Sequence, residues 1–169
     1  MAMSHLATMS MENPSKTILM ADDDPDDCLL TQDAWEEYAC PHTLRFVRDG
    51  QELLDYLNHR GKFSDTEDFP LPGMILLDLN MPKKNGHQAL KEIRDHEVFR
   101  HIPVVVMTTS IDEEDTCRTY ALGANACMTK PRSAQEFHTV VGALSQYWTS
   151  MVELPFGSET PSWDSFYNY

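Results

Sequence analysis

Acidic side chains, a hydroxyl and an ammonium group follow the short apolar runs of this chain. In chain order, these residues are Asp22, Asp23, Asp78, Thr108 and Lys130. Clustered carboxylates repel one another, and a hard divalent cation such as Mg²⁺ relieves that repulsion. A hydroxyl and an ammonium group beside the cation can hold a phosphoryl group, which an aspartate carboxylate can accept as an aspartyl phosphate. These residue types predict phosphoryl transfer to an aspartate, provided that the fold brings them together.

The apolar runs that precede these residues have the length of β-strands. They lie at 18–21, 44–47, 74–77, 104–107 and 126–128. Four of them are nearly continuous rather than alternating, which predicts strands that are covered on both faces. The run at 44–47 contains Arg45, and we predict that it forms an edge strand.

A helix-start signal follows each apolar run. The predicted N-caps are Asp24, Asp49, Asn85, Ser110 and Ser133, and the last four have Glu or Gln three residues later. Ser110 and Ser133 fit the capping box, while Asp24 precedes a proline that favours the first helical turn. In the last predicted helix the apolar residues form a single inward stripe of Phe137, Val140, Val141, Leu144, Trp148 and Met151.

Strand and helix signals alternate five times along the chain. This order predicts an α/β fold with parallel strands, right-handed crossovers and helices on both faces of the sheet. Ligands of such sheets bind beyond the carboxyl ends of the strands. We therefore expect the residues that leave the strands to converge at one edge of the sheet.

Composition and charge exclude several classes of function. The chain has 169 residues and a formal net charge of −14, which disfavours binding to nucleic acid or to an anionic membrane surface. No apolar run is long enough to span a bilayer, and we find no secretory signal. The four cysteines lack a C-x-x-C spacing, which indicates reduced thiols in a cytoplasmic protein.

The chain divides into three segments by composition. Residues 1–15 have no apolar period, which predicts a disordered leader. Residues 16–150 contain all strand and helix signals and form the predicted domain. Residues 151–169 form a C-terminal extension whose aromatic residues are unusual for a solvated tail, so docking and disorder both stay open.

From residue 16 to about residue 150, the chain resembles the receiver domain of two-component response regulators. The motifs that carry this resemblance are Asp22-Asp23, Leu77-Asp78-Leu79-Asn80-Met81-Pro82 with Gly86, Thr108, and Lys130-Pro131. The resemblance implies a doubly wound (βα)5 domain with the flavodoxin-like fold. This fold is a three-layer sandwich around a parallel five-stranded sheet with strand order 2-1-3-4-5.

The resemblance also implies the reaction. Asp78 would be phosphorylated by a sensor histidine kinase or a phosphotransfer domain. Thr108 would bond the phosphoryl group, Lys130 would pair with it, and the Lys130–Pro131 peptide bond would be cis. Such a protein is a phosphoryl acceptor and not an enzyme, apart from self-phosphorylation and autodephosphorylation.

The same resemblance implies a Mg²⁺ site. Asp23 and Asp78 would bind the ion directly, and the Asn80 carbonyl would be the third protein ligand. Asp22 would act through a water molecule.

Finer motifs are similar to those of small stand-alone response regulators that partner cyanobacterial and bacterial phytochromes. They are Met81-Pro82-Lys83-Lys84, the long connection 61–73, Thr108-Thr109-Ser110, and a last helix followed by Leu154-Pro155. The resemblance implies a phytochrome kinase as partner and a homodimer. Apolar residues after Ser150 have no obvious core to enter, so we predict that residues 148–156 form the centre of the dimer interface. Cys127 departs from the family, since receivers usually carry an aromatic residue three positions before the lysine.

Two alternative functions remain open beside the receiver, and two acids of the first predicted helix have a structural interpretation. An aspartate-nucleophile phosphohydrolase needs a second acid two residues after the nucleophile, where this chain has Asn80. A phosphorylation-independent adaptor would be expected to lack one of the five site residues, and all five are present. We interpret Asp26 and Asp27 as structural acids that the dipole of the first helix stabilises.

Overall fold

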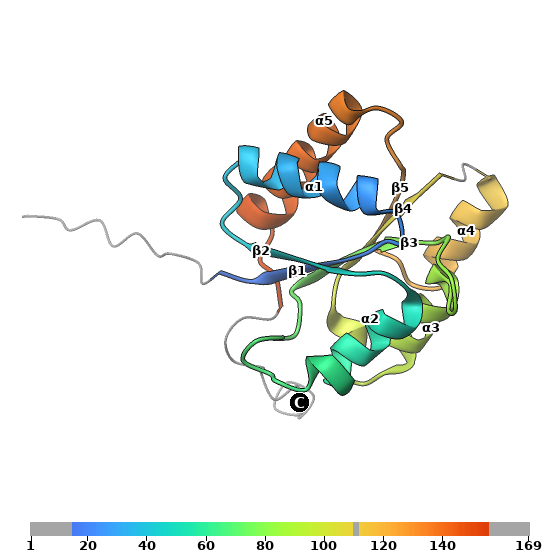
Figure 1. The fold of residues 1–169 in the computed structure, drawn as a ribbon. Helices are drawn as coiled ribbons and strands as arrows, with labels where there is room; N and C mark the ends of the chain where they lie inside the picture. The colour runs from blue at the N-terminus through green and yellow to red at the C-terminus, as the bar shows by residue number, and fades with distance from the viewer. Residues whose placement is uncertain (1–14, 110–111, 156–169) are drawn as a thin grey trace, which may run out of the picture.

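The computed structural model describes residues 15–109 and 112–155 (Figure 1). Its elements in chain order are β1 (Thr17–Ala21), α1 (Pro25–Glu37), β2 (Thr43–Val47), α2 (Gly50–Leu57), η1 (Gly61–Phe63), β3 (Met74–Asp78), α3 (Gly86–Asp95), η2 (Phe99–His101), β4 (Val104–Thr108), α4 (Glu113–Ala121), β5 (Ala126–Thr129), α5 (Ala134–Ser145) and η3 (Gln146–Met151). Among these residues, no helix is both long and apolar enough to cross a bilayer. The leader predicted at 1–15 falls almost wholly outside the described residues, as does the extension from residue 156 onward.

The five strands form one parallel sheet in the order β2-β1-β3-β4-β5. This arrangement confirms the predicted α/β fold and its strand order. β2, which contains Arg45, is an edge strand as predicted, and β5 forms the other edge. The register places Ala21 beside Leu77, so the residues that follow β1 and β3 leave the sheet next to each other.

Helices cover both faces of the sheet, with α1 and α5 on one face and α2 and α3 on the other (Figure 1). Successive strand residues alternate between the two resulting cores. Leu19 and Ile75 belong to the core beneath α2 and α3, while Ile18 and Met74 belong to the core beneath α1 and α5. This double burial is the reason that the central strands read as continuous apolar runs.

Four of the five predicted N-caps are confirmed. Asp24, Asp49, Asn85 and Ser133 each accept a hydrogen bond from a backbone amide in the first turn of the helix that follows. The prediction of Ser110 is wrong, because α4 begins at Glu113 and its cap is Asp112; Ser110 itself lies outside the described residues. The Asp112 carboxylate accepts from the Glu114 amide at 2.9 Å, ahead of a first turn whose acids suit the helix dipole.

The two predicted capping boxes are also wrong. The complete box belongs to α3, where Asn85 and Gln88 bond each other's backbone amides. At α5, Ser133 caps the helix, but the Glu136 carboxylate accepts from the Arg132 amide instead of the amide of the cap residue. The glutamate therefore reaches one residue beyond the position that the capping box requires.

The chain after α5 does not continue the predicted inward stripe. Residues 146–151 form a π-helical turn, and Met151 is 67% exposed. Because π turns bond i to i+5, they rotate later side chains out of phase with the preceding α-helix. Trp148 still packs against the core, but the prediction that Met151 faces inward is wrong.

Leu154 instead enters the core of its own chain. Its side chain is 5% exposed and belongs to the apolar cluster that contains Ile18 and Met74. Lys16 donates from its ammonium group to the Leu154 carbonyl, which fixes this segment beside the amino end of β1. The expectation that residues after Ser150 find no core is therefore wrong for Leu154.

Candidate functional site

The predicted site residues meet beyond the carboxyl ends of the strands. One carboxylate oxygen each of Asp22, Asp23 and Asp78 lie within 4.8 Å of one another. Asp22 follows β1, Asp78 ends β3, and the side chains of both are buried, whereas Asp23 is exposed. The sheet register, which aligns the ends of β1 and β3, is what brings acids from two distant parts of the chain together.

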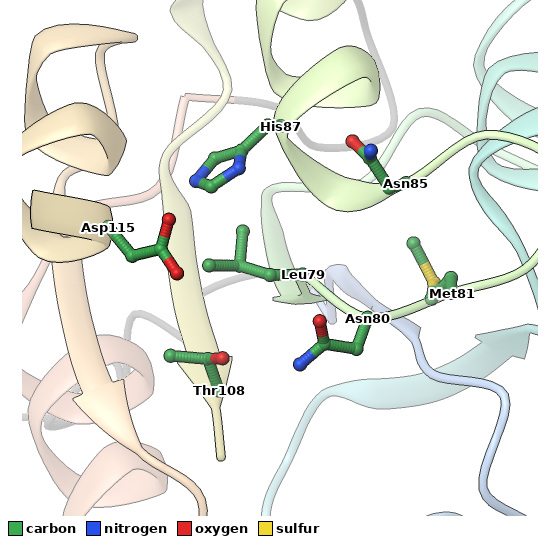
Figure 2. A pocket seen from close by; sticks show the side chains of 7 residues that line it. All are labelled: Leu79, Asn80, Met81, Asn85, His87, Thr108 and Asp115. Atoms are coloured by element: carbon green, nitrogen blue, oxygen red, sulfur yellow. The ribbon is translucent and has the colours of Figure 1, made fainter. Parts of the chain in front are cut away.

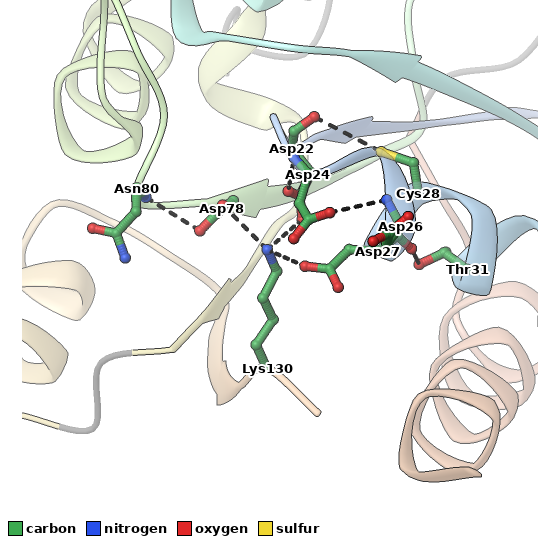
Figure 3. A network of polar contacts seen from close by, with 9 residues as sticks. All are labelled: Asp22, Asp24, Asp26, Asp27, Cys28, Thr31, Asp78, Asn80 and Lys130. Atoms are coloured by element: carbon green, nitrogen blue, oxygen red, sulfur yellow. Dashed lines mark hydrogen bonds and ion pairs between the residues drawn. The ribbon is translucent and has the colours of Figure 1, made fainter. Parts of the chain in front are cut away.

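The ammonium group of Lys130 joins three carboxylates (Figure 3). Its Nζ lies 2.6 Å from Asp27 Oδ2, 2.7 Å from Asp22 Oδ2 and 3.2 Å from Asp78 Oδ2. The backbone amide of Lys130 donates to the Thr108 carbonyl at 2.7 Å, which ties the end of β5 to the end of β4. Lys130 is thus fixed at both ends, with a side chain only 6% exposed.

The expected cis peptide bond before Pro131 is not present. The Lys130–Pro131 bond is trans, as are all peptide bonds between the described residues. Trans is the favoured isomer of an X–Pro bond by about 0.5–1 kcal/mol. The Lys130 side chain reaches all three carboxylates from this trans backbone.

Burial and charge shift the pKa values of the site in opposite directions. Burial raises the pKa of Asp22 to about 6, although Lys130 and the Asp24 amide partly oppose this. Burial also raises the pKa of Asp78 above its ordinary value. For Lys130, burial alone would lower the pKa, but the contacts with Asp22 and Asp27 outweigh it and raise the value. The site therefore holds ionised carboxylates at an energetic cost that a cation would relieve.

The donor set fits a hard divalent cation. Asp22 Oδ2 is buried and has no aligned hydrogen bond, since its contact with Lys130 is an ion pair outside hydrogen-bonding geometry. Asp23 is exposed and can face an ion that keeps several water ligands. Carboxylate oxygens at this spacing suit an ion that binds few protein ligands and many waters, and a cavity lies beside Asp22 and Asp23.

The loop between β3 and α3 sets the position of Asp78. Asp78 Oδ1 accepts from the Asn80 amide at 3.1 Å, and the Gly86 amide donates to the Leu79 carbonyl at 3.0 Å. A Cβ atom at Gly86 would lie 2.4 Å from the Asp78 carbonyl oxygen, which no side chain could tolerate without moving the backbone. Glycine at this position therefore allows the close approach of helix and strand that fixes Asp78.

Thr108 and Asn80 line a pocket between the ends of β3 and β4 and the first turns of α3 and α4 (Figure 2). The pocket has a volume of about 450 Å³ and is lined by Leu79, Asn80, Met81, Asn85, His87, Thr108 and Asp115. His87 Nε2 lies 3.0 Å from the hydroxyl of Thr119, which links α3 to α4 across this pocket. The buried Thr108 residue therefore lies at the wall of an open space next to the end of β3.

Sequence reasoning missed one member of the site. The sequence indicates only a structural role for Asp27, but its carboxylate makes the shortest of the three contacts with Lys130. No local signal separates Asp27 from Asp26, because the contact depends on where β5 places Lys130. Asp26, which the same interpretation covered, is exposed.

Comparison with known sequences agrees with this geometry. The sequence profile described as "Response regulator receiver domain" matches residues 18–142, which is most of the chain. The chain belongs to the family of response regulator receiver domains. It is a receiver with a role in phosphorelay signalling, and the profile ends within α5.

Individual relatives of this receiver cover most of its length. The chain is 37% identical to Response regulator Rcp1 from Synechocystis sp. (strain ATCC 27184 / PCC 6803 / Kazusa), over 85% of this chain and 95% of that protein. The crystal structure of the Mn²⁺-bound form of Rcp1 superposes with a TM-score of 0.77 and 36% identity, covering 83% of this chain and 99% of that one. The crystal structure of the phosphorylated cyanobacterial phytochrome response regulator RcpA superposes with a TM-score of 0.78 and 36% identity, covering 84% and 99% of the two chains.

Proposed function

We propose that Asp78 is the residue that accepts the phosphoryl group in this receiver. The supporting observation is its buried carboxylate, which lies beside Lys130 and within 4.8 Å of Asp22 and Asp23. Transfer from a phosphohistidine breaks the N–P bond and forms an O–P bond to Asp78, while the histidine regains its nitrogen lone pair. In this proposal, Lys130 and Thr108 bond the oxygens of the incoming group, which carries most of the charge of this reaction.

We propose Mg²⁺ as the ion at the carboxylate cluster. Asp23, Asp78 and the Asn80 carbonyl would be its protein ligands, and Asp22 would act through a water molecule. The Mn²⁺-bound structure of the relative Rcp1 supports a divalent ion, and hard oxygen donors support Mg²⁺. When bound, the ion neutralises the charge that gathers on the phosphoryl oxygens.

We propose that the donor is a sensor histidine kinase of the phytochrome type. Both relatives named above, Rcp1 and RcpA, are response regulators, and RcpA is described as a phytochrome response regulator. In this proposal, residues 16–150 form a cytoplasmic receiver that acts as a homodimer, and residues 151–169 form its C-terminal extension. It is a phosphoryl acceptor and not an enzyme that acts on other substrates.

The acceptor is tested by incubation with acetyl phosphate and Mg²⁺ followed by intact-protein mass spectrometry. The full chain should gain the mass of one phosphoryl group, and Asp78→Asn should gain none while it keeps its fold by circular dichroism. Asp33→Asn, which removes an exposed acid of α1, is the matched control and should behave like the parent protein. An undiminished mass gain in Asp78→Asn would show that another residue is the acceptor.

The donor is tested by phosphotransfer profiling. A phytochrome kinase that has phosphorylated itself should transfer its label to this chain faster than to an unrelated receiver present at the same concentration. Equal rates for the two receivers would contradict the proposed phytochrome partner.

A further inference from the structure

The carboxylate of Asp27 turns into the site although the residue lies in the exposed first turn of α1. Its side chain is 17% exposed, and its Oδ2 lies 2.6 Å from Lys130 Nζ. The adjacent Asp26 is exposed, and its backbone amide donates a hydrogen bond to the side chain of the N-cap residue Asp24. Both acids share the favourable end of the same helix dipole, so the dipole does not account for the contact that Asp27 makes.

The three carboxylates around Lys130 have different roles in the proposed reaction. Asp22 belongs to the cluster that fits the cation, and Asp78 is the proposed acceptor. The Lys130 ammonium group forms ion pairs with all three carboxylates, and it donates a hydrogen bond to Asp78 Oδ2. Once Asp78 carries a phosphoryl group, the donor that faced its carboxylate is needed by the phosphoryl oxygens. Of the three carboxylates, only that of Asp27 belongs neither to the cation site nor to the acceptor. Its contact with Lys130 can therefore persist through the reaction.

Asp27 is itself held firmly. The Thr31 hydroxyl donates to the Asp27 carbonyl at 2.7 Å, and Asp24 caps the same turn. Further along α1, Trp35 is buried in the core that lies between the sheet and the helices α1 and α5. The carboxylate of Asp27 is therefore attached to a helix that packs on the sheet, whereas Lys130 begins the connection from β5 to α5.

From this geometry we infer that Asp27 is a positioning residue, which holds the Lys130 ammonium group where it can pair with a phosphoryl group on Asp78. The inference rests on the proposed role of Asp78 as acceptor. Without Asp27, the flexible lysine chain keeps only partners that the cation and the phosphoryl group also engage. Small displacements of a positioning group cost rate even where the fold is intact.

Initial rates of phosphorylation by acetyl phosphate and Mg²⁺ give the first test. Asp27→Ala should lower the rate about tenfold or more, since it removes the anchor of Lys130. Asp27→Asn should fall between that variant and the parent, because the amide oxygen can still accept a hydrogen bond. Asp26→Ala is the matched control, since it removes a charge from the same turn, and its rate should stay within about twofold of the parent. Equal losses in Asp27→Ala and Asp26→Ala would overturn the inference.

A double-mutant cycle with Lys130→Gln tests whether Asp27 acts through its contact with Lys130. The free energy of unfolding in urea is measured in chelator-treated buffer for the parent, Asp27→Ala, Lys130→Gln and the double variant. A direct contact predicts that the shift in urea midpoint caused by Asp27→Ala is largely lost in the Lys130→Gln background. The same shift in both backgrounds would mean that Asp27 acts through the helix alone. This cycle needs no phosphorylation, so its outcome is independent of whether Asp78 is the acceptor.

Discussion

The hydroxyl of Tyr120 in α4 accepts a hydrogen bond from the backbone amide of Cys127 in β5 at 3.2 Å. β5 is an edge strand with a neighbouring strand on one side only, and this hydroxyl satisfies an amide of that strand. Cys127 itself lacks the aromatic ring that the family resemblance leads one to expect there. In this chain, a tyrosine of the preceding helix brings its ring to the backbone of that position.

Removal of this hydroxyl should loosen the edge strand. Tyr120→Phe should cost about 0.5 kcal/mol, the low end for a hydrogen bond, because Tyr120 is 49% exposed and water can replace the hydroxyl. The Cys127 amide should exchange its hydrogen faster, which NMR-detected hydrogen exchange measures residue by residue. Tyr147→Phe, a change at another half-exposed tyrosine, should leave the exchange of this amide unchanged. Unaltered exchange in Tyr120→Phe would contradict the contact.

Loss of one carboxylate should weaken the proposed Mg²⁺ site. Asp23→Ala is expected to raise the Kd for Mg²⁺ tenfold or more, since it removes a proposed ligand. This corresponds to a loss of at least about 1.4 kcal/mol of binding free energy. Isothermal titration calorimetry measures this directly. Asp33→Ala removes an exposed acid of α1 that is not part of the cluster, and its Kd for Mg²⁺ should equal that of the parent. Equal Kd values for Asp23→Ala and the parent would exclude Asp23 as a ligand.

The stability that Asp49 contributes should depend on pH. Burial alone would raise its pKa, but the Glu52 amide and the Lys83 ammonium group outweigh it and lower the pKa below the ordinary value. A lowered pKa means that the folded state favours the ionised form. Its contribution is therefore complete above the unfolded-state pKa of about 3.9 and disappears as the pH falls through the lower folded-state value.

Asp49→Asn isolates this charge, because asparagine is also a good N-cap. At neutral pH the variant should be less stable than the parent by roughly 0.5–1 kcal/mol. The difference should shrink toward zero as urea unfolding is repeated at acidic pH, below about 3.9. A difference that stays constant across this range would show that the charge is not its source.

Leu154 should contribute to stability as a core residue. Leu154→Ala is expected to cost about 2–5 kcal/mol, the usual range for a buried leucine, measured by urea unfolding. Met151→Ala, three residues earlier, should have little effect because Met151 is 67% exposed. Similar small costs for both variants would indicate that the segment after α5 does not pack in solution.

The proposed homodimer should depend on the exposed residues of this region and not on Leu154. Tyr147 is 54% exposed and Met151 is 67% exposed, so a charge at either position can disrupt an interface without disturbing the core. Multi-angle light scattering at micromolar concentration should give a dimer for the parent and a monomer for Tyr147→Glu combined with Met151→Glu. A parent protein that is monomeric with and without a phosphoryl mimic would end this proposal.

Local features of this chain were determined by the sequence itself. Runs such as 74–77 form strands wherever both of their faces can be buried, and Asp24, Asp49, Asn85 and Ser133 cap helices because their side chains reach amides only two or three residues away. The order of strands and helices restricts the topology to few choices. The convergence of Asp22, Asp23 and Asp78 follows from that topology, since all parallel strands end at one edge.

The tertiary structure alone decided which of several similar groups make contact. Asp26 and Asp27 have the same chemistry and adjacent positions, and only the placement of β5 beside β4 brings Lys130 to Asp27. Leu154 and Met151 are both apolar, but a π-helical turn rotates one outward before the chain carries the other into the core. These contacts depend on distances between segments that are far apart in sequence, and no local propensity or spacing encodes those distances.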